Sequence, residues 1–253
     1  MIDLHCHVLP GLDDGPQTLG ESLAMCRMAA ADGIRVVVAM PHTLNGVYCN
    51  EGEAVREAVA ELQEAVRGEG LSLEILPGSD VHVDPAVKAM IRDGRVMTIN
   101  DTGRAVMLEF PDYFVREAMC RFLESLIKEG IVPVISHPER CSQFRDDGLL
   151  KEMVRMGAVV QITAMSLTGR FGPGIQAIAR SFLERGLVHV MATDAHSANH
   201  RPPVLSEAVA SASRILGEEA SRLVTDNPRA LVEGRRPASS NPMHHALCAS
   251  SGG

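Results

Sequence analysis

Two histidines near the amino terminus lie two residues apart at the end of a short apolar run. His5 and His7 follow Ile2–Leu4, and residues two apart on a strand face the same side. The carboxylate of Asp14 follows after a turn. Neutral imidazoles beside a carboxylate suit a divalent transition metal. The pattern predicts a metal site, although two ordinary histidines at a strand end would give the same short motif.

Ligand-capable side chains also follow most of the later apolar runs. These residues are His42, Asp80, Glu109, His137, Asp194 and His196. The run that ends at Thr163 supplies Gln161 and Thr163 instead. In a parallel barrel the carboxyl ends of the strands meet at one face. We therefore expect all nine candidates to form one metal cluster, although each of them alone has an ordinary structural explanation.

The elements that would position these residues are strands alternating with helices. Seven short apolar runs are expected to be strands: Ile2–Leu4, Arg35–Met40, Ser72–Leu76, Ala105–Leu108, Val132–Ser136, Ala158–Thr163 and Val188–Thr193. Helical periodicity lies between them, which predicts a parallel sheet with crossover helices. The fold class is α/β, and we expect a closed or nearly closed, distorted (β/α)7 TIM-like barrel. The alternative is an open doubly wound sheet, but no glycine-rich dinucleotide motif supports it.

Local signals place several boundaries. Thr18 and Glu21 form a capping-box pattern at the first helix, whose predicted apolar face is Leu19, Leu23, Cys26 and Ala30. Glycines precede six of the strands, at positions 33, 70, 103, 130, 157 and 186, where a helix must end before the chain turns. Residues 204–224 predict one or two helices, and Asn227-Pro228 predicts a last short one. We expect a single domain over residues 1–234 and a disordered tail over 235–253, in which His244-His245 is not a metal site.

The composition limits the function. The 253 residues carry 24 Lys and Arg against 32 Asp and Glu, a net charge of −8, with no basic block. This balance argues against nucleic acid as the main ligand. No apolar run is long enough for membrane insertion, and the amino terminus has no signal-peptide pattern. Six scattered cysteines without a C-x-x-C pair predict reduced thiols and a cytoplasmic location. Cys141 lacks the glycine-rich Cys-to-Arg loop of a cysteine phosphatase.

Several longer motifs carry a resemblance to a known family. The amino-terminal MIDLHCHVLPGLDDG is joined by PHTLNGVY, SHPER, SLTGRFG and TDAH followed by RPP. Together they resemble the polymerase and histidinol phosphatase (PHP) superfamily, and within it the bacterial manganese-dependent protein-tyrosine phosphatases of the CpsB/YwqE type. The likeness covers about residues 1–233. It implies a phosphatase that acts on tyrosine kinases controlling capsule and exopolysaccharide synthesis.

The resemblance implies three divalent ions and a ligand set for each. One ion would bind His5, His7, Glu109 and Asp194; a second Asp80, Glu109 and His137; and the third Asp14, His42 and His196. The family usually has Glu at the position of Asp80, so the shorter side chain makes the second ion the weakest. Nitrogen and oxygen ligands suit Mn²⁺, Fe²⁺ or Zn²⁺, and the family favours Mn²⁺.

Arginines near these motifs could bind phosphate. Arg140 follows His-Pro-Glu and Arg201 follows Asp-Ala-His, and both are predicted to hold phosphate oxygens, because arginine binds phosphate bidentately. Arg170 in Gly-Arg-Phe-Gly is a weaker candidate. The predicted reaction is hydrolysis of a phosphotyrosine protein by attack of a metal-bridged hydroxide on phosphorus. A small-molecule phosphatase such as one for histidinol phosphate, a nuclease and an inactive metal-binding regulator are the alternatives.

Overall fold

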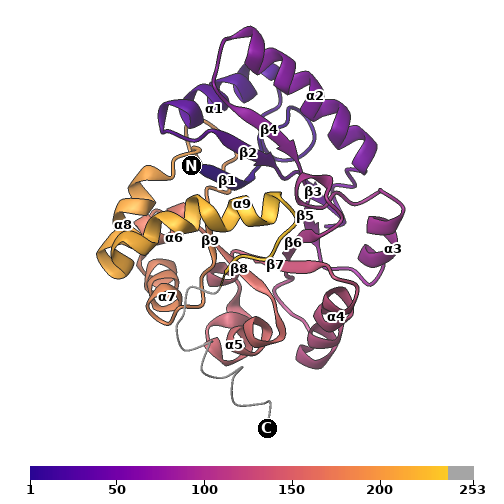
Figure 1. Ribbon diagram of the computed structural model, residues 1–253, viewed down its shortest axis with the longest axis vertical. Coiled ribbons are helices and arrows are strands. Elements are labelled where there is room, and N and C mark those ends of the chain that lie inside the picture. Colours follow the sequence, from indigo (N-terminus) through magenta and orange to yellow (C-terminus); the bar gives the residue numbers. More distant parts are fainter. Residues whose placement is uncertain (239–253) are drawn as a thin grey trace.

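The computed structural model describes residues 1–238, and in this range strands alternate with helices along the chain (Figure 1). The strands are β1 (Ile2–Cys6), β2 (Val36–Ala39), β3 (His42–Thr43), β4 (Glu74–Pro77), β5 (Asp80–His82), β6 (Ala105–Glu109), β7 (Val132–Ser136), β8 (Val159–Thr163) and β9 (Val190–Ala192). All pairings between these strands are parallel. The predicted α/β class and parallel strands are confirmed.

Helices connect the strands and surround them. They are α1 (Leu19–Ala31), α2 (Gly52–Gly68), α3 (Val87–Arg92), α4 (Arg116–Lys128), α5 (Asp147–Met156), α6 (Ala164–Thr168), α7 (Pro173–Glu184), α8 (Ser206–Leu216) and α9 (Asp226–Val232). Short 3-10 helices cover η1 (Ile99–Asp101), η2 (Pro138–Arg140), η3 (Ser142–Phe144) and η4 (Gly217–Val224). The capping box is present: the Thr18 hydroxyl accepts a hydrogen bond from Glu21 N, and the Glu21 carboxylate accepts one from Thr18 N. The six predicted glycines all have positive φ.

The strands form two sheets rather than the one continuous barrel sheet that the sequence predicts. One sheet has the order β1-β2-β4 and the other β3-β5-β6-β7-β8-β9. The division falls between β2 and β3 and between β4 and β5. Pro41 separates β2 from β3, and proline has no N–H to donate to the ladder. β1 nevertheless meets the chain beyond β9: Asp194 N donates to His5 O at 2.7 Å, and His7 N donates to Ala195 O at 2.8 Å. The carboxyl ends of the first and last strands are thereby joined.

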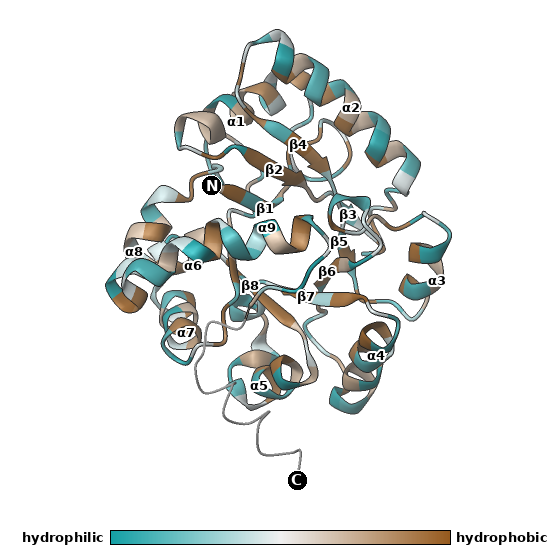
Figure 2. Ribbon diagram, in the orientation of Figure 1, coloured by the Kyte–Doolittle hydropathy of each residue, from teal (hydrophilic) through white to brown (hydrophobic). Residues whose placement is uncertain are grey.

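Side chains alternate between two apolar cores along the strands. The inner core is Leu4, Val38, Met40, Ile99, Ala105, Met107, Val134, Val159, Val190, Ala192 and Leu231, drawn from most strands and from α9. The outer core packs the opposite faces of the strands against the helices. Figure 2 shows the strands as mainly hydrophobic and the helices as mixed, as expected for a parallel sheet covered on both faces. This packing fixes the strand ends on which the candidate ligands lie.

The predicted apolar face of α1 is only partly right. Cys26 is buried and Leu23 packs against the outer core, but Leu19 is 45% exposed, and the other buried residues are Ser22, Met25 and Ala29. The helix is rotated because its small and flexible side chains fit the outer core, which hydrophobicity alone does not predict. The predicted tail lies outside the described residues from position 239 onward, and so does His244-His245.

Candidate metal centre

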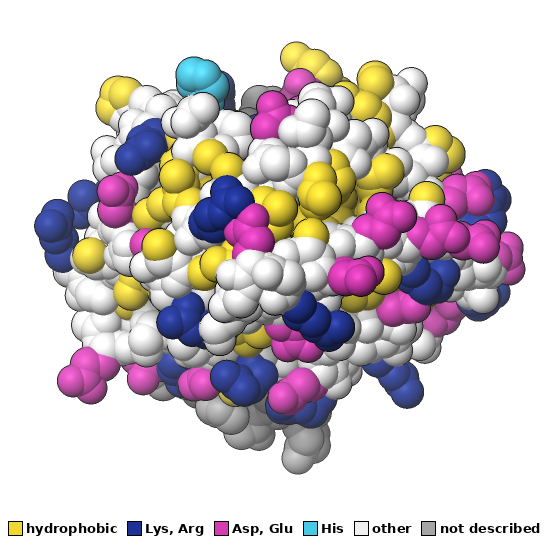
Figure 3. Space-filling view, turned by 90° about the horizontal axis from the view of Figure 1, so that it is seen from above, with side chains coloured by type: hydrophobic (Ala, Val, Ile, Leu, Met, Phe, Trp, Pro, Cys, Tyr) yellow, Lys and Arg dark blue, Asp and Glu magenta, His cyan; other side chains and the backbone are white. Residues whose placement is uncertain are grey.

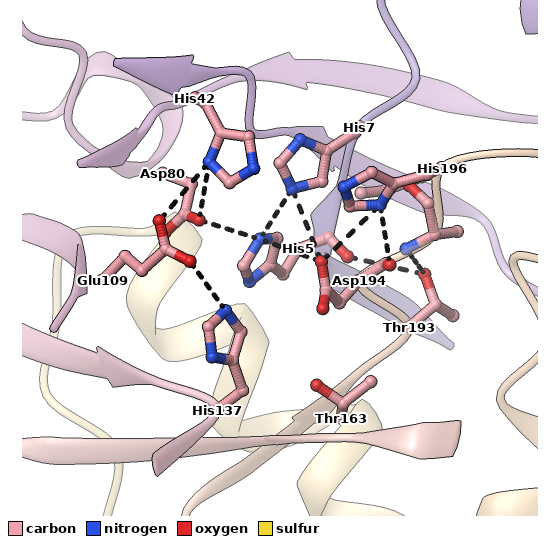
Figure 4. A network of polar contacts seen from close by, with 12 residues as sticks. His5, His7, His42, Asp80, Glu109, His137, Thr163, Thr193, Asp194 and His196 are labelled. Carbon is pink, nitrogen blue, oxygen red and sulfur yellow. Dashed lines mark hydrogen bonds and ion pairs between the residues drawn. The ribbon is translucent and has the colours of Figure 1, made fainter. Parts of the chain in front are cut away.

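The structure brings all nine predicted ligand residues together at the carboxyl ends of the strands. Each takes part in at least one approach of 3.3–3.7 Å between an imidazole nitrogen and a carboxylate oxygen. Figure 4 labels all of them except Asp14. The structure contains three groups in which all ligand atoms lie within 4.8 Å of one another. These groups are His7, Asp14, His42 and His196; His5, His7 and Asp80; and His42, Asp80 and Glu109. The convergence expected from strand order is therefore present in the fold.

His42 lies between two of these groups. Its Nε2 is 3.6 Å from Asp14 Oδ1, whereas its Nδ1 is 3.3 Å from Asp80 Oδ2 and 3.6 Å from Glu109 Oε2. His196 approaches Asp14 from the other side, with Nε2 3.4 Å from Oδ1. Asp14 is the most exposed of these residues. The two imidazoles therefore converge on one carboxylate at the open side of the cluster.

Several buried polar atoms in the cluster lack the partners that burial normally demands. Both carboxylate oxygens of Asp80 and Nδ1 of His42 are buried without a hydrogen bond, and unsatisfied buried groups are rare. Burial and the neighbouring charge of Asp80 also raise the pKa of Glu109 to about 7. Divalent cations between these groups would satisfy the orphaned atoms and stabilise both carboxylates. The donor set and its geometry thus fit metal ions.

Two residues that the sequence did not assign as ligands orient the first histidines. Asp13 Oδ2 lies 2.6 Å from His7 Nδ1, and Gln161 Oε1 lies 3.1 Å from His5 Nδ1. Burial opposes charge on His7, but hydrogen bonds to Asp13 and Asp194 outweigh it and raise the pKa of His7 to about 10. Such outer partners fix the tautomer and direction of ligating imidazoles. The sequence signal was their position, next to Asp14 and at the end of the sixth predicted strand.

We expect Asp13→Ala to weaken divalent-metal binding by about 10- to 100-fold. The substitution removes the acceptor of the His7 ring and also the acceptor of His42 N, which lies 3.0 Å from Asp13 Oδ2. Titration of the metal-free variant with Mn²⁺ measures the affinity. Asp93→Ala, an exposed position after α3, is the control and should bind metal as the wild type does. Equal affinities in the two variants would contradict the role of Asp13.

Backbone strain is concentrated at two of the candidate ligands. His137 and Asp194 have φ of 32° and 51°, which is unusual for residues other than glycine. Asp194 is held there by neighbours: its own N–H bonds to His5 O, and the Thr193 side chain donates to buried Asp3. Burial also raises the pKa of Asp3 to about 6. These contacts stabilise the strained backbone of Asp194, which directs its carboxylate into the cluster.

Two of the three predicted phosphate-binding arginines lie beside the cluster. Arg140 and Arg201 both form ion pairs with Asp194 Oδ2, while Asp194 Oδ1 faces the imidazoles of His5 and His7. Burial alone would raise the pKa of Asp194, but the neighbouring histidines and Arg140 hold it well below its ordinary value. Arg170 instead lies 3.5 Å from Glu207 on the surface. The two oxygens of Asp194 therefore have different neighbours: Oδ1 faces the histidines, and Oδ2 faces the arginines.

A parallel α/β fold with a buried imidazole–carboxylate cluster at its strand ends defines a candidate metallohydrolase. The family model for capsular polysaccharide synthesis, CpsB/CapC, matches residues 1–233. The chain belongs to this family, and the resemblance read from the motifs is confirmed.

Named relatives and solved structures agree with this membership. The chain is 37% identical over 237 residues to the tyrosine-protein phosphatase YwqE of Bacillus subtilis, covering 93% of this chain and 92% of YwqE. It is 29% identical to the tyrosine-protein phosphatase CpsB of Streptococcus pneumoniae, with coverages of 92% and 98%. A solved structure from work on YwqE and CpsB, described as metal-dependent tyrosine phosphatases, superposes with a TM-score of 0.88 at 35% identity, covering 94% and 99% of the two chains. A β-aspartyl dipeptidase from Fervidobacterium islandicum shares the fold alone, at a TM-score of 0.56 and 16% identity, with coverages of 96% and 76%.

Proposed function

We propose that this protein is a metal-dependent phosphatase that hydrolyses phosphotyrosine in proteins. The observation that carries the proposal is the cluster of nine imidazole and carboxylate side chains with Arg140 and Arg201 at its edge. A divalent cluster beside fixed guanidinium groups is suited to a phosphate ester, which carries negative charge at neutral pH. The names of the relatives YwqE and CpsB support the same activity.

The proposed ligands are those that the family resemblance implies. One ion is held by His5, His7, Glu109 and Asp194; a second by Asp80, Glu109 and His137; and a third by Asp14, His42 and His196. The donors favour Mn²⁺, with Fe²⁺ or Zn²⁺ as alternatives. The Asp80 carboxylate supports a bound cation here, because both of its oxygens are buried without a hydrogen bond, and Oδ2 lies 3.3 Å from His42 Nδ1 and 3.6 Å from His5 Nε2. Bound cations of this kind supply Lewis acidity and lower the pKa of water.

The arginines complete the proposed site. Each guanidinium carries five N–H donors and keeps its charge at any physiological pH. Asp194 accepts from only part of each guanidinium, and Nε of Arg201 is buried without a hydrogen bond. The remaining donors of Arg140 and Arg201 would bind the non-bridging phosphate oxygens as charge develops. A tyrosine phenolate then leaves with little assistance, because the pKa of tyrosine is about 10.

The wider setting of the reaction follows from the family. We propose a bacterial tyrosine autokinase of polysaccharide synthesis as the partner, a cytoplasmic location, and one domain over residues 1–234 whose two sheets act as one distorted (β/α)7 barrel. Among the described residues, none of the helices could cross a membrane. Figure 3 shows acidic and basic side chains interspersed on the face over α1 and α2, which is unlike the basic surface of a nucleic-acid-binding protein.

Arg201→Lys should be impaired in phosphotyrosine-peptide hydrolysis, and Arg201→Ala should be impaired more. Lysine keeps the charge but loses the planar pair of donors. The lost charge-assisted hydrogen bonds predict a fall in kcat/KM of about 10- to 100-fold for the alanine variant. Steady-state kinetics and melting temperature are measured on the same preparations. Unchanged kinetics beside a large drop in melting temperature would make Arg201 structural.

A substrate panel tests the proposed function directly. Protein loaded with Mn²⁺ is assayed against a phosphotyrosine peptide, histidinol phosphate and single-stranded DNA. We expect the peptide to be hydrolysed with the highest kcat/KM. Preference for histidinol phosphate would indicate a small-molecule phosphatase, cleavage of DNA a nuclease, and inactivity on all three a metal-binding regulator.

A further inference from the structure

The Gly-Arg-Phe-Gly segment between α6 and α7 is a tight turn that points an aromatic residue at the site. Gly172 N donates to Gly169 O at 3.0 Å, so Arg170 and Phe171 occupy the two central positions. Gly169 has φ of +85°, and a Cβ at this position would lie 3.0 Å from the Gln176 side chain. The positive φ favours glycine at this position, and any larger residue would also have to displace the end of the Gln176 side chain. The turn holds Phe171 in a defined place.

Phe171 lies against both arginines of the candidate site. The guanidinium carbon of Arg140 is 5.5 Å from the centre of the Phe171 ring, and that of Arg201 is 5.9 Å away. Both distances are within the range of cation–π attraction. The ring is partly buried, so water screens these contacts incompletely. A neutral ring can hold two guanidinium groups without competing for their N–H donors, which an additional carboxylate would do.

A buried carboxylate connects the Phe171 turn to the turn that carries Arg140. Glu139 Oε1 accepts from Thr163 N at 2.9 Å and from Ser166 Oγ at 2.7 Å. Glu139 lies in η2 directly before Arg140, and Ser166 lies in α6, the helix that ends at the Gly-Arg-Phe-Gly turn. Arg140 and Phe171 are therefore built on segments that are tied together inside the protein. Their contact follows from this framework and does not depend on a flexible side chain alone.

The geometry points to Phe171 as a positioning residue that holds the guanidinium groups of Arg140 and Arg201 ready for phosphate. This inference rests on the proposed function, in which these arginines bind the phosphoryl group. Two positive side chains that share one carboxylate, Asp194, repel each other. The attraction of each guanidinium group to the Phe171 ring, whose centre lies 5.5 Å and 5.9 Å away, offsets part of that repulsion. Phe171 thus acts on phosphate through the arginines.

The test measures how strongly two anions inhibit hydrolysis of a phosphotyrosine peptide by Mn²⁺-loaded protein. Inorganic phosphate binds at the arginines and the metal ions without an aromatic group, and phenylphosphonate carries a comparable phosphonate group on an aromatic ring. Phe171→Leu removes the aromatic face but keeps an apolar side chain, and we expect both inhibition constants to rise by the same factor of about three to ten. Phe171→Tyr should restore both constants to within about twofold of the wild type. Metal content should be unchanged in every variant.

Controls separate positioning from other roles. Phe122→Leu makes the same change at a partly buried position on α4, and it should leave both inhibition constants at the wild-type values. If Phe171→Leu does not fold, Phe171→Met supplies the non-aromatic variant. Unchanged phosphate inhibition in Phe171→Leu would overturn the inference, and so would weaker inhibition by phenylphosphonate alone, because the ring would then contact substrate directly. The wild type tests the proposed function separately. If the wild-type protein neither hydrolyses the peptide nor binds phosphate, both the proposed function and the role of Phe171 are overturned.

Discussion

Removal of divalent metal should abolish phosphotyrosine-peptide hydrolysis, and Mn²⁺ should restore it. The cluster holds nine ligand-capable side chains and several buried polar atoms without partners, so we expect the chemistry of the site to depend on cations. A metal ion lowers the pKa of bound water from about 15.7 to about 7, which raises the concentration of hydroxide nucleophile at neutral pH by many orders of magnitude. We therefore expect chelator-treated protein to lose essentially all turnover. Metal analysis beside kinetics on the stripped and reloaded protein measures this.

Alkylation of Cys141 tests whether a thiol takes part in the reaction. Cys141 Sγ contacts Pro111 O at 3.8 Å, and burial raises the pKa of its thiol above the ordinary value. A reactive cysteine requires the opposite shift, toward the thiolate. Alkylation of Cys141 should therefore leave most of the activity in place. Hydrolysis that survives chelator but is lost on alkylation would exclude the metal mechanism.

His196→Ala and His42→Ala should each lower kcat by about 100-fold or more, a size typical of losing an electrostatic group at the reacting centre. Both imidazoles face Asp14 Oδ1, at 3.4 Å and 3.6 Å, so either change opens the proposed third site. The structure adds a distinction between the two variants. His42 also faces Asp80 and Glu109, so its loss should reduce metal content more than the loss of His196.

Metal stoichiometry, kcat and circular dichroism are compared for these variants. His200→Ala is the matched control, because His200 is exposed in the loop that follows His196 and bonds only through its backbone to Ser197 among the described contacts. It should keep wild-type metal content and rate. We expect the fold of all three variants to be intact, since residues at the strand ends build the site and contribute little to the core. A near wild-type kcat for His196→Ala would remove the third site from the proposal.

Metal affinity should fall as the pH falls, because protons compete with metal ions for His7. The pKa of His7 in the metal-free protein is raised to about 10 by Asp13 and Asp194, against the effect of burial. A ligating imidazole must be neutral, so each metal that binds His7 displaces a proton. The carboxylate partners that orient His7 therefore also make metal affinity fall as the pH falls.

The amino-acid sequence by itself determined the features that depend on neighbours along the chain. Apolar runs, glycines with positive φ and the Thr18–Glu21 capping box specify local structure, so the strands and helix boundaries could be predicted from short windows. The ligand types were also readable, because parallel strands bring whatever follows them to one face. The motifs further identified the family, which the family match confirms.

The tertiary structure decided the features that depend on residues far apart in the chain. The sequence did not predict that α1 buries Ser22, Met25 and Ala29, or that the strands divide into two sheets. It also did not identify Asp13 and Gln161 as partners of the histidine ligands. The contact of Phe171 with both arginines joins residues that are 30 or more positions apart. Such pairings are set by how side-chain volumes fill the space between packed elements. Periodicity and spacing describe only one element at a time, so they contain no information about these contacts.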